Sequence, residues 1–192
     1  MPLKLNSSGG GSVTLDTPST ASTFTLTVPA ITGTAVVTGS SATVSQGMLA
    51  AGVAGNGPAF SAYASGVTNT PNATFTKIVL ASEEFDTASC FDTSLSRFTP
   101  NVAGYYFVCG GVSAGYATQI TTIYKNGSEY KRGVQVSSAG AYLSGTTASA
   151  LVYMNGSTDY VELYWYQASG STVNSSAVQA STYFQGFLAR AA

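Results

Sequence analysis

The chain has 192 residues, of which 44% are hydrophobic and 11% aromatic, enough for one domain with a packed core and an extension. Only 8% are charged and the net charge is −1, whereas soluble domains are about 25% charged. Phosphate binding needs clustered Lys and Arg. Among the seven basic residues only Lys131 and Arg132 are adjacent, which excludes a nucleic-acid partner. A surface with so few charged residues is either covered with Ser, Thr, Asn and Gly or largely buried in an assembly. We expect an assembly.

The first residues turn polar at Asn6, whereas a signal peptide carries an apolar stretch of about 7–15 residues after its basic start. The longest apolar-looking run, 48–55, is too short to span a bilayer. We therefore expect that the protein does not insert into a membrane. We expect it to be assembled in a cytoplasm.

Aromatic residues divide the chain. Residues 1–59 contain one aromatic, Phe24, while the remainder contains every other Phe, all twelve Tyr and the single Trp. The boundary runs through a stretch rich in Gly, Ala and Ser, which is typical of a linker. We expect three parts: an N-terminal segment 1–40, a linker 41–57 and a head 58–192.

The N-terminal segment has strand patterning but too little length for a core. Phe24, Leu26 and Val28 alternate with threonines, and a threonine also separates Val13 from Leu15, so each strand has one apolar face. About forty residues cannot bury a core by themselves. We expect the surface of a sister chain or of another protein to hold this segment.

The head contains short strand-like runs separated by turn residues. An Asn-Gly pair flanked by strand formers is the strongest short hairpin signal. It occurs twice, at Asn126-Gly127 between 121–125 and 128–136, and at Asn155-Gly156 between 148–154 and 160–166.

The second of these hairpins leads into a strand with two apolar faces. Val161, Leu163 and Trp165 line one face, and three tyrosines with Glu162 line the other. This pattern suits a strand with the core on one side and a subunit contact on the other. Since no window predicts a long amphipathic helix, we expect an all-β sandwich of about 130 residues.

Four segments of the head follow the order of a known family: Phe60-Ser61-Ala62, the stretch 91–107, Ile123-Tyr124-Lys125-Asn126-Gly127 and Phe184-Gln185-Gly186-Phe187-Leu188. Together they resemble the globular head of the complement q-subcomponent, which shares the tumour necrosis factor fold. The resemblance implies a ten-stranded jelly roll whose three copies pack around an aromatic-lined axis. The chain departs from the family at Val108, where a Phe is usual, and it has no Gly-X-Y repeat.

The resemblance also implies a set of signature residues in the core: Phe91, Phe98, Pro100, Gly104, Tyr106, Phe184, Gly186 and Phe187. Gly104 begins a strand where a side chain could obstruct the turn, and Pro100 ends the preceding strand because it lacks an N–H donor. The closing aromatic strand is suited to the middle of a sheet.

Residues 1–15 and 23–34 resemble the N-terminal anchors of bacteriophage fibre and appendage proteins. Joined to the head, this resemblance implies a virion appendage that is assembled in the host cytoplasm and exposed on the particle. Segment 1–40 would attach to other virion proteins, and the homotrimeric head would serve host-surface adhesion or decoration by contacting a glycan or a protein. The alternative is a soluble trimeric binding module of a prophage or bacterium, with no virion role.

One motif suggests catalysis and one suggests metal binding. Gly111-Val112-Ser113-Ala114-Gly115 matches the nucleophile elbow of hydrolases, but without any His the chain cannot build a Ser-His-Asp relay. We interpret it as small residues in a turn between strands and expect neither an enzyme nor a cofactor. The acidic run lacks the spacing of a calcium loop, so we expect a solvated strand edge without metal, formed by Glu83, Glu84, Asp86 and Asp92.

Cys90 and Cys109 are expected to be free thiols, with Cys109 as a small core residue; a disulfide between them is the alternative. Exposed tyrosines offer rigid area with a polar tip for sugars and proteins. The tyrosines nearest to predicted loops and strand ends, and hence the candidate ligand contacts, are Tyr116, Tyr130 and Tyr142.

Overall fold

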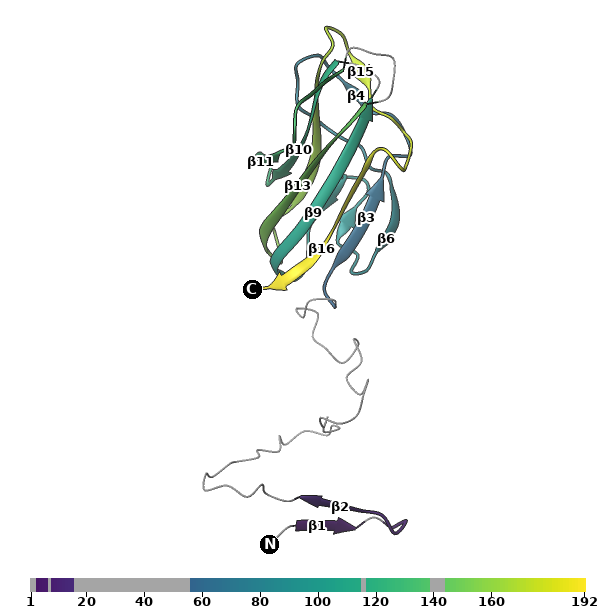
Figure 1. The fold of residues 1–192 in the computed structure, drawn as a ribbon, viewed down its shortest axis with the longest axis vertical. Coiled ribbons are helices and arrows are strands. Elements are labelled where there is room, and N and C mark those ends of the chain that lie inside the picture. Colours follow the sequence, from purple (N-terminus) through teal and green to yellow (C-terminus); the bar gives the residue numbers. More distant parts are fainter. Residues whose placement is uncertain (1–2, 7, 16–55, 115–116, 139–143) are drawn as a thin grey trace. The chain divides into compact units, whose positions relative to one another are not determined.

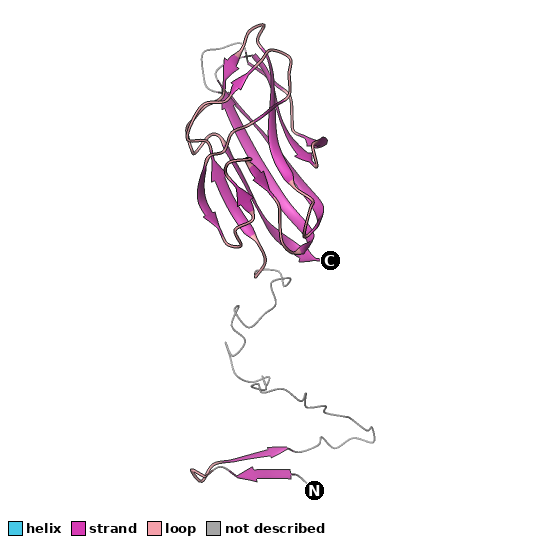
Figure 2. Cartoon of the chain, turned by 180° about the vertical axis from the view of Figure 1, so that it is seen from behind, coloured by secondary structure: helices cyan, strands magenta, loops and turns pink. Residues whose placement is uncertain are grey.

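The computed structural model describes residues 3–6, 8–15, 56–114, 117–138 and 144–192 (Figure 1). All regular structure in these ranges is β-strand, as Figure 2 shows. The chain divides into two units, 1–41 and 42–192.

The N-terminal unit contains an antiparallel hairpin of β1 (Leu3–Asn6) and β2 (Ser12–Leu15), in which Leu3 lies opposite Leu15. Gly10 supplies the positive φ of 86° at the turn. The strand predicted around Val13 and Leu15 is confirmed. The strand predicted at 24–28 and most of the linker 41–57 lie outside the described residues.

The head consists of two main sheets. The first has five strands in the order β13 (Ser144–Asn155), β9 (Ala103–Ala114), β16 (Tyr183–Ala191), β3 (Ala59–Tyr63) and β6 (Ser82–Asp86). The second runs β11 (Ser128–Arg132), β10 (Ala117–Lys125), β14 (Val161–Ala168), β8 (Arg97–Phe98) and β7 (Phe91–Asp92), with β12 (Val136–Ser138) and β5 (Thr76–Lys77) paired to β10 and β14. A separate pair joins β4 (Asn69–Thr70) to β15 (Val173–Asn174).

This architecture is an all-β sandwich of the jelly-roll type, as the sequence predicted. The expected count of ten strands is not confirmed: the described part of the head has nine strands of three or more residues, and five pairing segments of two residues each. The closing strand β16 lies between β9 and β3, so the prediction that it sits in the middle of a sheet is confirmed.

The first Asn-Gly pair forms the predicted hairpin. It joins β10 to β11, with φ values of 51° at Asn126 and 78° at Gly127, as a tight two-residue turn requires.

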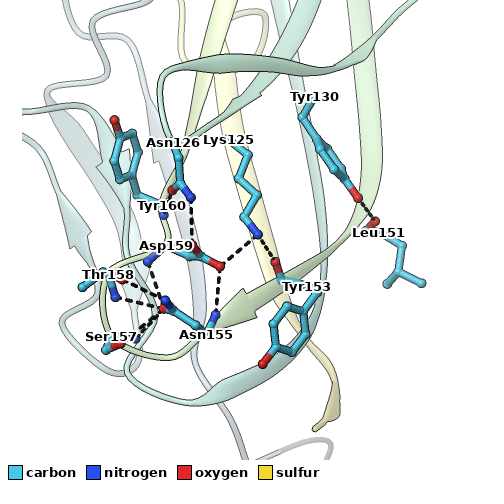
Figure 3. A network of polar contacts seen from close by, with 10 residues as sticks. All are labelled: Lys125, Asn126, Tyr130, Leu151, Tyr153, Asn155, Ser157, Thr158, Asp159 and Tyr160. Atoms are coloured by element: carbon cyan, nitrogen blue, oxygen red, sulfur yellow. Dashed lines mark hydrogen bonds and ion pairs between the residues drawn. The ribbon is translucent and has the colours of Figure 1, made fainter.

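The second Asn-Gly pair does not form a hairpin, and this prediction is wrong. It follows β13, which pairs with β9, and leads to β14, which pairs with β10 in the other sheet. The Asn155 side-chain oxygen accepts the backbone N–H groups of Ser157, Thr158 and Asp159 at 2.9–3.0 Å (Figure 3). This wider turn is what carries the chain from one sheet to the other.

The core lies between the sheets and is rich in aromatic rings. Phe60 stacks on Phe98 with ring centroids 4.2 Å apart, and Tyr106 meets Phe98 edge to face at 5.5 Å. The signature residues that the structure buries, as expected, are Phe91, Phe98, Pro100, Gly104, Tyr106, Phe184 and Gly186.

Phe187 is the exception, and its assignment to the core is wrong. Its side chain is 51% exposed, because Phe184, Gly186 and Leu188 occupy the inward positions of β16 and alternation turns Phe187 outward. The lack of room for a side chain at Gly104 is confirmed, but the obstacle is the neighbouring strand β16 and not the turn: a Cβ at Gly104 would lie 2.5 Å from the carbonyl oxygen of Arg190.

Candidate functional site

The outward face of the five-stranded sheet carries a cluster of exposed apolar side chains. Leu151, Phe107 and Phe187 are register partners across β13, β9 and β16, and Tyr153 lies opposite Tyr105 in the next row. Leu151 is 58% exposed, although it lies within the 12-residue strand β13. We define the apolar patch as Phe85, Tyr105, Phe107, Leu151, Tyr153 and Phe187.

Four of the aromatic rings of the apolar patch lie in two neighbouring pairs. The rings of Tyr105 and Tyr153 lie 5.5 Å apart, and those of Phe107 and Phe187 lie 5.9 Å apart. A hollow of about 190 Å³ lies beside Phe85, Phe107 and Phe187. Contiguous exposed apolar surface of this kind marks a contact with another macromolecule.

Charge is almost absent from four of the five strands of this sheet, and the acidic residues Glu83, Glu84 and Asp86 lie on the fifth, the edge strand β6. Strands β3, β9 and β13 contain no charged residue, and β16 contains only Arg190. The aromatic part of this face on β9, β13 and β16 resembles the buried centre of an interface, where charged residues are depleted and aromatic residues are enriched.

The opposite sheet carries the paired charges instead. Glu162 is 2% exposed, and its Oε1 accepts hydrogen bonds from Arg97 Nε at 3.0 Å and Lys77 Nζ at 3.3 Å. The Arg97 guanidinium also lies 3.6 Å from the ring centroid of Tyr160. The outward face of β14, predicted to be a subunit contact, is thus occupied by an ion-pair cluster within the same chain, and the apolar patch lies on the other sheet.

The outer edge of β13 is covered by side chains from the neighbouring strands β10 and β11 (Figure 3). Lys125 Nζ donates to the carbonyl oxygen of Tyr153 at 2.7 Å and pairs with Asp159 at 2.9 Å. The Tyr130 hydroxyl donates to the carbonyl of Leu151 at 3.1 Å. Occupied carbonyls hinder edge-to-edge strand addition, so a partner of this sheet would dock on its face.

The structure describes one of the three predicted ligand tyrosines. Tyr130 is exposed on β11, and its hydroxyl is engaged with Leu151. Tyr116 and Tyr142 lie outside the described residues.

The hydrolase-like motif has no catalytic geometry. Ser113 is buried inside β9, and its hydroxyl lies 3.3 Å from the carbonyl oxygen of Ser144. Residues 111–114 are therefore the last four residues of β9 and not a turn as predicted, because the pairing of β9 with β13 continues unbroken to Ala114.

The acidic run lies mainly on β6, the edge strand of its sheet, as expected, with Glu83, Glu84 and Asp92 exposed. The described residues contain no group of three or more His, Cys, Asp or Glu that could hold a metal ion. Nor do they include a helix with the length and hydropathy to cross a membrane.

Both cysteines are free. Cys90 lies in the core, and burial raises the pKa of its thiol. Cys109 was expected in the core too, but it is half-buried on the outward face of β9, because the inward positions of this strand belong to Val108 and Gly110.

Comparison with solved structures identifies proteins that share the fold of the head. The sequence matches no family model and no curated protein. Among solved structures, the globular domain of zebrafish complement 1qA superposes with a TM-score of 0.56 at 14% identity, over 70% of this chain and 98% of that one. Murine APRIL gives 0.56 at 9% identity, over 68% and 98%, and Eiger TNF from S. frugiperda gives 0.56 at 10%, over 70% and 93%.

At these identities the similarity establishes the fold alone. The head has the jelly-roll fold shared by complement 1q and tumour necrosis factor domains, which confirms the fold predicted from the signature segments.

Proposed function

We propose that the protein is a non-enzymatic structural and attachment protein that assembles as a homotrimer through the apolar patch. The observation that carries this proposal is the cluster of exposed apolar side chains on β13, β9 and β16, three neighbouring strands whose only charged residue is Arg190. Leaving such a face in water is costly, since apolar burial contributes about 25 cal/mol per Å².

The contact is heterologous: the patch of each subunit meets a different surface of the next, and a rotation that closes after three copies gives a ring without free patches. The capped edge of β13 supports face-to-surface packing, since it leaves few free carbonyls for a continuous intersubunit sheet.

The setting that we propose is a bacteriophage particle. The resemblance of residues 1–15 and 23–34 to phage appendage anchors supports attachment of segment 1–40 to other virion proteins. The β1–β2 hairpin has backbone edges onto which a neighbouring strand could add. The head then points outward and contacts the host surface, with weak binding multiplied by the copies in the trimer.

Light scattering of the full-length protein tests the assembly. We expect the mass of a trimer, and a monomer for Leu151→Asp and Phe187→Asp, each of which places a charge in the patch. Val67→Asp is the matched control, because Val67 is similarly exposed (53%) but lies outside the patch. A monomeric wild type at micromolar concentration, or trimeric patch variants, would contradict the proposal.

Thiol labelling gives an independent reading of the same contact. Cys109 lies on the patch-bearing face, next to Phe107 and Gln185, and we expect it to react faster in Leu151→Asp than in the wild type. Cys90, buried in the core, is the internal control and should stay unreactive in both. For the particle itself, antibody labelling of purified virions distinguishes an appendage from a free binding module.

A further inference from the structure

A second concave site lies on the same sheet, toward the end opposite to the C-terminus. It is a cleft of about 430 Å³, within the range of about 300–1,000 Å³ that is usual for small-ligand sites. Strands β3, β6 and β16 and the loop before β16 supply its polar and aromatic lining: Ser61, Tyr63, Glu84, Gln179, Tyr183 and Gln185.

A β-bulge gives Glu84 its position in the cleft. Ser61 pairs with Phe85 and Ala62 pairs with Glu83, which leaves Glu84 as an extra residue without a register partner. Such an extra residue bends the strand and redirects its side chain. Here the carboxylate reaches over β3 and toward the loop that contains Gln179.

Two hydrogen bonds fix the Glu84 carboxylate. The hydroxyl of Ser61, which is 3% exposed, donates to Oε2 at 2.7 Å, and the amide of Gln179 donates to Oε1 at 2.6 Å. These two bonds lower the pKa of Glu84, so the group is ionised at neutral pH. Each carboxylate oxygen retains capacity to accept a further hydrogen bond.

Aromatic side chains and an amide complete the lining. Tyr63 and Tyr183 are register partners on β3 and β16, and Gln185 follows Tyr183 on the same face two residues later. A sugar ring needs such a combination, because its C–H face packs on aromatic rings while its hydroxyls need donors and acceptors.

Charge determines which sugars fit. No Lys or Arg lines the cleft, and Glu83 and Asp86 lie on the same strand as Glu84. Carboxylated or sulfated sugars would therefore meet like charge without compensation. An uncharged sugar meets a fixed acceptor instead.

We propose that this cleft binds one neutral sugar residue of a surface glycan, with the Glu84 carboxylate accepting hydrogen bonds from two adjacent hydroxyls and with Tyr63 and Tyr183 contacting the ring. The inference rests on the proposed attachment role of the head and names its ligand class. On β9, β13 and β16 the apolar patch lies toward the C-terminal end of β16, whereas the cleft involves the first residues of β16. The two sites adjoin at Gln185, which lines both the cleft and the hollow beside Phe107.

Saturation-transfer NMR on the full-length protein tests the cleft, with glucose, galactose, mannose and N-acetylglucosamine as neutral probes and glucuronate as the anionic probe. We expect saturable millimolar binding of at least one neutral sugar and none of glucuronate. Glu84→Gln should weaken binding about tenfold, as for a lost hydrogen bond to a charged group.

Glu83→Gln is the matched control, since it removes the same charge from the same strand but does not line the cleft; it should bind like the wild type. Tyr63→Phe should retain binding, and Tyr63→Ala should lose it. The proposal is overturned if no neutral sugar binds, if glucuronate binds as well as the neutral sugars, or if both Glu variants bind equally.

Light scattering of the same samples keeps the two proposals apart. A trimer that binds no neutral sugar refutes the cleft and leaves the assembly intact. A monomer whose sugar binding depends on Glu84 refutes the assembly and leaves the cleft intact.

Discussion

Replacing Phe98 by Ala tests the core on which the placement of both sheet faces depends. Phe98 is fully buried, stacks on Phe60 at 4.2 Å and meets Tyr106 at 5.5 Å. Truncating a buried Phe costs about 3–5 kcal/mol, and each lost aromatic pair is worth about 0.5–1.5 kcal/mol. We therefore expect Phe98→Ala to lower the free energy of unfolding by about 4–5 kcal/mol, near the upper limit of this range.

Thermal unfolding followed by circular dichroism measures this effect. For a domain of this size about 1 kcal/mol corresponds to roughly 3–5 °C, so a loss of about 4–5 kcal/mol should lower the Tm by roughly 12–25 °C. Protomer concentration is held constant, because the stability of an oligomer depends on it. Leu95→Ala, at an exposed position in the preceding turn, is the control and should change the free energy of unfolding by about 0.5 kcal/mol or less. An unshifted melt for Phe98→Ala would show that the aromatic core is misplaced.

Three further predictions concern the Asp159 ion pair, metal binding and the N-terminal segment. Hydrogen bonds from Lys125 and Asn126 hold the pKa of Asp159 below its usual value, so the stability that this group contributes is present above about pH 3.9 and is lost as the pH falls through the lower folded-state pKa. Asp159→Asn should therefore lower the Tm at neutral pH, and the gap to wild type should narrow on acidification; a constant gap would refute the ion pair. Chelators should leave the Tm unchanged, because the described residues offer no metal-ligand group; a drop reversed by added calcium would contradict this. Deleting residues 1–40 should leave a folded trimer, since the core lies within the second unit, but abolish incorporation into particles that lack the native copy; full cosedimentation of the truncated protein would place the anchor elsewhere.

Two sequence-based predictions assigned a residue to the wrong face of its strand. Phe187 and Cys109 were assigned to the core, yet both point outward from the five-stranded sheet. Each lies on a strand that is apolar on both faces, and a one-residue change of register exchanges the two faces. Which face is buried therefore depends on pairing with distant strands.

The candidate sites could not be found from the sequence for the same reason. The apolar patch combines residues between 85 and 187, and neither Phe107 nor Leu151 stands out from its neighbours in the sequence. The cleft depends on the bulge that places Glu84 beside Ser61 and Gln179. Both sites come from contacts across many residues, which local patterns do not encode.

Features that depend on local chemistry could be predicted from the amino-acid sequence. Alternating apolar residues fixed the buried face of β14 through Val161, Leu163 and Trp165, Asn126-Gly127 fixed one hairpin, and the absence of His removed the Ser-His-Asp relay. The tertiary structure was needed to show that Asn155-Gly156 crosses between the two sheets. It was also needed to show that the ion pairs of Glu162 lie on one sheet, while Phe107 and Phe187 are exposed on the other. The physical reason is that turn type and alternation act over a few residues, whereas sheet membership and register are set by pairing between strands far apart in the chain.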